Sequence, residues 1–84
     1  KYILETRDIS AGLAAINAHS LKQRAAIRDM LTEQQPDGSY RITFQAEIGG
    51  LRGKKRRAKF LEHLAADPAV VSLHVYSHDE SAVF

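Results

Sequence analysis

Residues 39–48 read SYRITFQAEI, and apolar and polar side chains alternate along this stretch. The apolar set is Tyr40, Ile42, Phe44, Ala46 and Ile48, and the polar set is Arg41, Thr43, Gln45 and Glu47. Alternation with a period of two predicts a β-strand that buries one face and exposes the other. Residues 35–38, just before it, read QPDG, in which proline fixes φ and Asp-Gly tolerates a positive φ. We therefore expect a tight turn there, with a β-hairpin around it.

The hairpin decides between two structures for residues 24–34. Helix propensity alone favours one long helix that continues from residue 11 and stops only before Pro36. Such a helix would leave the strand after the turn without its nearest partner. Because the turn demands a partner strand, we favour a strand from Ile27 to Glu33.

The first part of the chain predicts a strand and then a helix. Residues 2–6 are rich in apolar side chains and contain the β-branched Ile3 and Thr6, which is typical of a strand. Residues 11–23 are rich in alanine and have high helix propensity. Two candidate N-caps, Asp8 and Ser10, precede them.

The last part of the chain repeats this pairing in the same order. Residues 54–66 show an amphipathic helical pattern, and Asp67-Pro68 ends it because a residue before proline avoids the α region. Residues 70–77 alternate again and predict the final strand. The order strand, helix, strand, strand, helix, strand predicts an α+β, ferredoxin-like βαββαβ fold. In it, both helices cover one face of a four-stranded antiparallel sheet.

The length of 84 residues fits one domain with a modest aliphatic core. We assign residues 1–77 to this single domain and expect residues 78–84 to form a flexible C-terminal tail. The chain opens on Lys1 directly before a strand and has no initiator Met, so we interpret it as a piece of a longer protein. The core is expected to centre on Ile42, Phe44, Leu61, Leu64, Val71, Leu73 and Val75.

The composition restricts the possible chemistry. The chain has no cysteine, which excludes disulfides, thiolate nucleophiles and cysteine-ligated zinc. No nucleophile–base pair or phosphate-binding loop is recognisable, and we interpret His19, His63, His74 and His78 as surface residues. We therefore expect no catalytic residues, no cofactor and no metal ligands. No apolar run approaches the ~20 residues that span a membrane, and no signal peptide is visible.

The polar side of the central strand also disfavours nucleic acid as a partner. RNA-binding domains of this topology stack bases on aromatic side chains at this face, and residues 41, 43, 45 and 47 include no aromatic residue. Ser72, His74 and Tyr76 extend the same polar face. A polar open face disfavours a large hydrophobic interface, so we expect a monomer or a weak dimer in isolation.

Six cations occur within the eight positions 52–59. They crowd the N-terminal end of a helix, where the helix dipole disfavours each positive charge by a few tenths of a kcal/mol. A solvated helix face explains such a run without a partner. Alternatively, a bound anion offsets the crowded positive charge, and the backbone N–H groups of the neighbouring glycines contact that anion. The candidate residues for an anionic ligand, an acidic membrane surface or a protein partner are Arg52, Lys54, Lys55, Arg56 and Lys59.

Several stretches resemble an ACT domain: YILET at 2–6, Asp8 followed by AGLAAI at 11–16, AAI at 25–27, and DGSYRITF at 37–44. The resemblance implies an ACT-like regulatory domain that pairs through its sheets and, in many members, binds a small effector. In such domains the effector lies near the loop between the first strand and the first helix. The candidate ligand-binding residues are then Asp8, Ser10 and Gly12. Ile9-Ser10-Ala11 departs from the tighter turn of the amino-acid-binding members.

The stretch FLEHLAADPAVVS at 60–72 is similar to the cytosolic C-terminal domain of MgtC/SapB-type membrane proteins. Those proteins join an ACT-like tail to a transmembrane domain linked to magnesium limitation and virulence. The resemblance implies a non-enzymatic regulatory domain on the cytoplasmic side, tethered to the inner membrane through an N-terminal part that would be its main partner. The alternative is an ACT domain of a metabolic enzyme or regulator that senses an amino acid or another anion.

Overall fold

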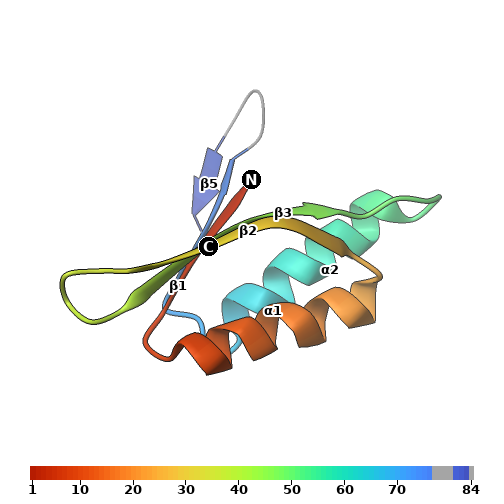
Figure 1. Ribbon diagram of the computed structural model, residues 1–84. Helices are drawn as coiled ribbons and strands as arrows, with labels where there is room; N and C mark the ends of the chain where they lie inside the picture. The colour runs from red at the N-terminus through yellow and green to blue at the C-terminus, as the bar shows by residue number, and fades with distance from the viewer. Residues whose placement is uncertain (77–80, 84) are drawn as a thin grey trace.

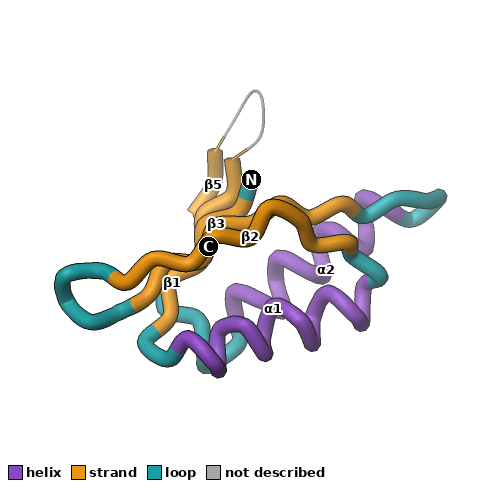
Figure 2. The backbone as a smooth tube through the Cα atoms, in the orientation of Figure 1, coloured by secondary structure: helices purple, strands orange, loops and turns teal. Residues whose placement is uncertain are grey.

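The computed structural model describes residues 1–76 and 81–83. In chain order the elements are β1 (Tyr2–Thr6), α1 (Ile9–Gln23), β2 (Ala26–Gln34), β3 (Tyr40–Glu47), α2 (Gly53–Ala66), β4 (Ser72–Tyr76) and β5 (Ser81–Val83). The strands form one antiparallel sheet in the order β2-β3-β1-β4-β5. Both helices lie on one face of this sheet (Figure 1) and pack side by side there (Figure 2). The elements from β1 to β4 confirm the α+β, ferredoxin-like βαββαβ fold.

The hairpin forms where the sequence predicts it. Gln35 accepts a hydrogen bond from Gly38 N–H and donates one to Ser39, which closes the turn, and Gly38 takes a φ of 89°. Asp37 accepts hydrogen bonds from the backbone and hydroxyl of Ser39, which hold the pKa of the Asp37 carboxyl below its usual value. The pairing runs from Gln34 with Tyr40 to Ala26 with Glu47.

The strand interpretation of residues 24–34 is therefore confirmed over the single long helix. Helix α1 ends because Arg24 takes the left-handed conformation, with a φ of 54°. In this conformation the N–H groups of Arg24 and Ala25 bond to the carbonyls of Leu21 and Ser20, which satisfies the open end of the helix. A second irregularity, a bulge between Arg28 and Leu31, interrupts β2.

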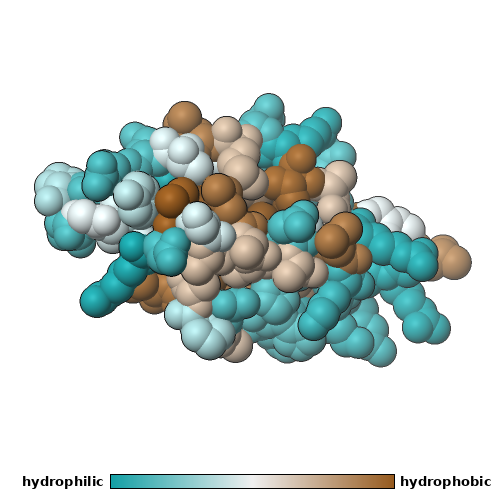
Figure 3. Space-filling view, turned by 60° about the horizontal axis from the view of Figure 1, so that its bottom comes forward, coloured by the Kyte–Doolittle hydropathy of each residue, from teal (hydrophilic) through white to brown (hydrophobic). Residues whose placement is uncertain are grey.

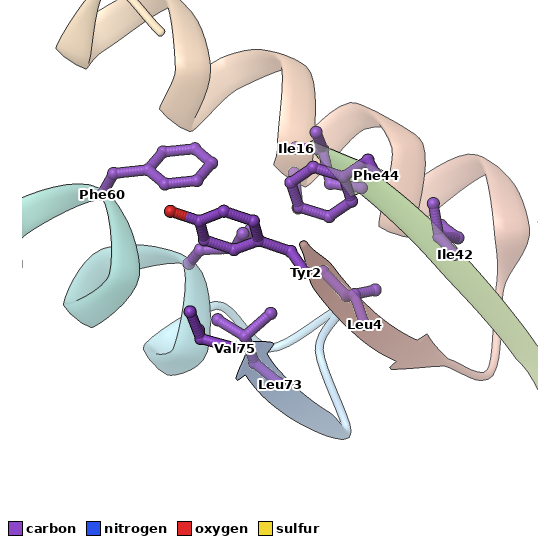
Figure 4. Packing of buried hydrophobic residues seen from close by; sticks show 10 residues of the cluster. Tyr2, Leu4, Ile16, Ile42, Phe44, Phe60, Leu73 and Val75 are labelled. Carbon is purple, nitrogen blue, oxygen red and sulfur yellow. The ribbon is translucent and has the colours of Figure 1, made fainter. Parts of the chain in front are cut away.

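Aromatic contacts form the centre of the core. Tyr2 stacks on Phe44 with ring centroids 5.2 Å apart, and its edge meets Phe60 at 5.9 Å. Figure 4 shows Tyr2 between these two rings, with aliphatic side chains of the sheet beside them. The rings come from β1, β3 and α2, so one cluster joins three elements that are distant in sequence. The other members of the buried cluster are Leu4, Ala15, Ile16, Ile42, Leu64, Leu73 and Val75.

Five of the seven expected core residues are buried, and two differ from the expectation. Leu61 is half-buried at the edge of the cluster, because α2 turns Phe60 into the centre in its place. The prediction that Val71 belongs to the core is wrong, since this side chain is 58% exposed. Val71 lies in the connection between α2 and β4, one residue before the strand begins.

The flexible tail expected at residues 78–84 needs a correction. Ser81–Val83 form β5, which pairs antiparallel with β4 from Tyr76–Ser81 to His74–Val83. The reason is that β4 presents an open edge whose backbone groups accept another strand. Residues 78–80 and 84 lie outside the described residues.

The open face of the sheet is less uniformly polar than the sequence suggests. Thr43 has Ile3 of β1 as its neighbour on one side and Leu31 of β2 on the other. Ile3 is half-buried and Leu31 is 57% exposed. The expected polar residues thus share this face with two aliphatic side chains from the flanking strands.

Replacing Phe44 by alanine removes a fully buried ring from the aromatic cluster. We expect the free energy of unfolding to fall by ~3–5 kcal/mol, measured by chemical denaturation. The control is Gln45→Ala, on the exposed side of the same strand, where we expect a change of less than ~0.5 kcal/mol. Equal losses in the two variants would contradict the described core.

Candidate functional site

A hollow of about 750 Å³ lies beside α1. Its floor is made of four alanine side chains of α1, and the connection from α2 to β4 forms its wall. The charged residues Arg7, Asp8 and Asp67 also line it. Figure 3 looks at the helix side of the molecule and shows apolar surface in the middle of this face, with polar residues around it. The hollow therefore combines a methyl-lined floor with charges of both signs.

The hydroxyl group of Thr6 connects the segments around the hollow. Its Oγ1 atom lies 2.7 Å from the carbonyl oxygen of Ala69 and 3.0 Å from that of Asp8. The same oxygen accepts a hydrogen bond from the backbone N–H of Asp8. Thr6 is only 1% exposed, so these bonds are shielded from water. The end of β1, the start of α1 and the α2–β4 connection are thereby held at fixed positions.

The sequence offered Asp8 and Ser10 as candidate N-caps of the first helix, and Asp8 is the N-cap of α1. Its Oδ1 atom accepts hydrogen bonds from the N–H groups of Ser10 and Ala11, at 3.0 and 3.3 Å. Ser10 itself is exposed and does not line the hollow. Of the three residues that the ACT resemblance implies as ligand-binding, the structure therefore places Asp8 at the hollow and Ser10 beside it.

Gly12, the third of these residues, faces the sheet rather than the hollow. A Cβ atom at this position would lie 2.6 Å from Cγ2 of Thr6 and 3.2 Å from Cδ1 of Ile42. Contacts this short are not found in proteins, so only glycine lets α1 approach the sheet this closely. Gly12 thus acts as a packing residue and positions α1 behind the floor of the hollow.

A histidine–aspartate pair at the wall of the hollow was not predicted from the sequence. Nε2 of His19 lies 2.9 Å from Oδ2 of Asp67, whose Oδ1 accepts a hydrogen bond from the N–H of Ala69. The hydrogen bond from Ala69, and to a smaller extent the one with His19, holds the pKa of the Asp67 carboxyl below its usual value. The folded state therefore favours the ionised form, and this stabilisation is lost as the pH falls through the range where aspartate is protonated. The ring of His63 lies 6.3 Å from that of His19.

Most of the predicted basic residues meet at the opposite end of the helices. Gln23, in the last turn of α1, lies beside Arg52, Lys55, Arg56 and Lys59, and together they line a small hollow of about 160 Å³. Lys54 is exposed next to them and does not line it. Two ion pairs are found among the described residues, His19–Asp67 and Arg28–Glu47, and neither includes a cation of α2.

His74 lies outside both sites, on the open face of the sheet, where its ring stacks on Tyr76 at a centroid distance of 6.2 Å. His78, which was predicted as a surface residue, lies outside the described residues. Neither helix in the described part of the chain is long and apolar enough to cross a membrane.

Comparisons with known proteins give no match: no protein-family model, no curated protein and no solved structure is significantly similar to this chain. The ACT and MgtC/SapB resemblances therefore remain hypotheses based on the residues quoted for them.

Gly12→Ala tests how closely α1 approaches the sheet. In most helices this substitution stabilises by up to ~1 kcal/mol, because alanine has the higher helix propensity. Here we expect a loss of ~1–3 kcal/mol, because the added methyl group overlaps Thr6. Gly49→Ala is the matched control, since its Cβ would meet nothing within 4 Å. Thermal denaturation measures both, and a stabilised Gly12→Ala variant would show that the described approach is too close.

Proposed function

We propose that this chain is a non-enzymatic regulatory domain that binds a small effector in the hollow beside α1. The observation that carries the proposal is the place of the hollow. It lies at the loop between β1 and α1, where the ACT resemblance implies an effector site, and Asp8 of that loop lines it.

The lining restricts the chemistry of such an effector. Alanine methyl groups offer contact to an aliphatic body but no directed bond. Arg7 can pair with a carboxylate or another anion at the rim, and the carboxylates of Asp8 and Asp67 can attract an ammonium group. A small amino acid carries both charges and an apolar side chain, so it fits this lining best.

The parent protein that we propose is a membrane protein of the MgtC/SapB type, with this chain as its cytoplasmic C-terminal domain. The residues that carry this resemblance, 60–72, form the second half of α2 and the wall of the hollow, including Asp67 and Ala69. The alternative parent, an amino-acid-responsive enzyme or regulator, is favoured by the charges at the rim. Sequencing the complete reading frame separates the two, because transmembrane spans upstream support the first and an enzyme domain contradicts it.

We also propose that the isolated chain is a monomer or a weak dimer. The predominantly polar open face supports this, although Ile3 and Leu31 add apolar surface to it. Sedimentation of the isolated chain tests the proposal, and a stable dimer at micromolar concentration would contradict it.

The effector site is tested by titrating the chain with the standard amino acids and with magnesium. A ligand at 100 times its dissociation constant should stabilise the fold by ~2.7 kcal/mol, which appears as a higher melting temperature. Ala14→Phe places a ring on the exposed side of α1 in the hollow and should abolish this shift. Ala58→Phe places the same ring on the exposed side of α2, outside the hollow, and should leave the shift unchanged. Equal responses of the two variants would contradict binding at this hollow.

A further inference from the structure

The end of the molecule opposite the hollow carries an exposed apolar tip. The connection between β3 and α2 extends beyond the sheet at the right of Figure 1. Leu51 in this connection is 107% exposed, which means that no other residue covers its side chain. A single exposed leucine is common in proteins, so its surroundings decide whether it has a role.

The surroundings of Leu51 are almost entirely basic. Residues 18–28 and 48–61 hold nine of the 12 basic residues of the chain, and the acidic residues next to them in sequence are Asp29, Glu47 and Glu62. These segments lie together in space, because Gln23 at the end of α1 lies beside Arg52 and Lys55. The nearest acidic residue on β3, Glu47, is already paired with Arg28. The small net charge of +2 therefore hides a strong separation of charge along the molecule.

The stability of α2 does not explain this arrangement. The first turn of α2 has no acidic residue, and its N-cap, Arg52, makes no capping hydrogen bond through its side chain. Positive charges at this end of a helix oppose the helix dipole. The cations of the first turn therefore cost a little stability where they are, which is expected of residues that serve an external partner.

The shape of this end of the molecule favours an extended anionic surface over a small anion as the partner of the basic residues. The groove at Gln23 uses only part of the cluster, and it leaves Leu51, Lys54 and Arg57 without a role. A flat anionic surface would contact the projecting loop and the exposed cations on both sides of it at once. A lipid surface offers both anionic groups and an apolar layer beneath them, which matches cations beside a projecting leucine.

We propose that this end of the domain docks on an anionic lipid membrane. Leu51 enters the apolar boundary of the bilayer, while the cations of residues 52–59 contact the lipid headgroups. The hollow then lies at the far end and stays open to the solvent. The biological setting of this docking rests on the proposed membrane-linked parent protein. Docking does not depend on the effector site, and lipid binding can be measured on this chain alone.

Vesicle flotation tests the docking directly. The chain should bind vesicles that contain phosphatidylglycerol and not vesicles of phosphatidylcholine alone, and high salt should weaken the binding because it screens the charges. Leu51→Ser should lower the partition coefficient about tenfold, since the buried side chain is lost. Each of Lys54→Gln and Lys55→Gln should lower it about fivefold.

Matched controls separate docking from general effects of charge and hydrophobicity. Leu31→Ser removes another exposed leucine, and Arg7→Gln removes a cation at the hollow; neither should change the partition coefficient. All variants change exposed side chains, and an unchanged melting temperature confirms their folding.

Three results would overturn the proposal. The first is the absence of binding to anionic vesicles at low salt. The second is an equal loss of binding in Leu31→Ser and Leu51→Ser. The third is saturable binding of inorganic phosphate that competes with the vesicles and is unchanged in Leu51→Ser, which would assign the cluster to a small anion. A reading frame without transmembrane spans would remove the proposed parent but leave vesicle binding intact, so the two failures are distinguishable.

Discussion

The hydrogen bonds of the Thr6 hydroxyl group hold together the segments around the hollow. This hydroxyl bonds to backbone groups of the β1–α1 and α2–β4 connections, while the methyl group of Thr6 sets the distance to Gly12 of α1. Without the hydroxyl, the carbonyl group of the half-buried Ala69 would lose its hydrogen bond, and a typical bond of this kind contributes ~0.5–1.5 kcal/mol. Without the glycine, α1 could not lie this close to the sheet. One residue thus fixes both the helix layer and the wall of the hollow.

This junction makes the two ends of the molecule different. The helices are antiparallel, since His19 of α1 bonds to Asp67 after the end of α2, and Gln23 lies beside the start of α2. One end therefore gathers the N-terminus of α1 and the α2–β4 connection, with mixed charges and alanine side chains. The other end gathers the C-terminus of α1 and the β3–α2 loop, with predominantly positive charge. We infer that these ends serve different partners: a small effector and a lipid surface.

The fold was largely predictable because its strongest signals are local. The alternation in β3 and the turn before it defined a hairpin, and the hairpin required β2 even though its sequence also suits a helix. The end of α1 at residue 23 is confirmed, although it was inferred from the hairpin and not from a local stop signal, because Arg24 takes a left-handed conformation for which glycine is the usual residue. Periodicity failed at Val71, which continues the alternation of the last strand but lies before β4 begins and is exposed.

The candidate site was less predictable because its contacts join distant residues. His19 and Asp67 are 48 positions apart, and nothing near either residue indicates the other. Gly12 was expected at a ligand because of its place in a family pattern, whereas its contacts show a packing role. The basic run was visible in the sequence, but its meeting with the end of α1 and the exposure of Leu51 required the three-dimensional arrangement.

The two ends of the domain are inferred to face different surroundings, one the solvent and the other a lipid surface. Paramagnetic relaxation from spin-labelled anionic lipids in nanodiscs measures this residue by residue. We expect strong broadening of the amide signals from Gly50 to Lys55 and no broadening at Asp8 and Ala69, since these lie at the far end. Broadening that is equal at both ends, or stronger at Asp8 and Ala69, would contradict the claim.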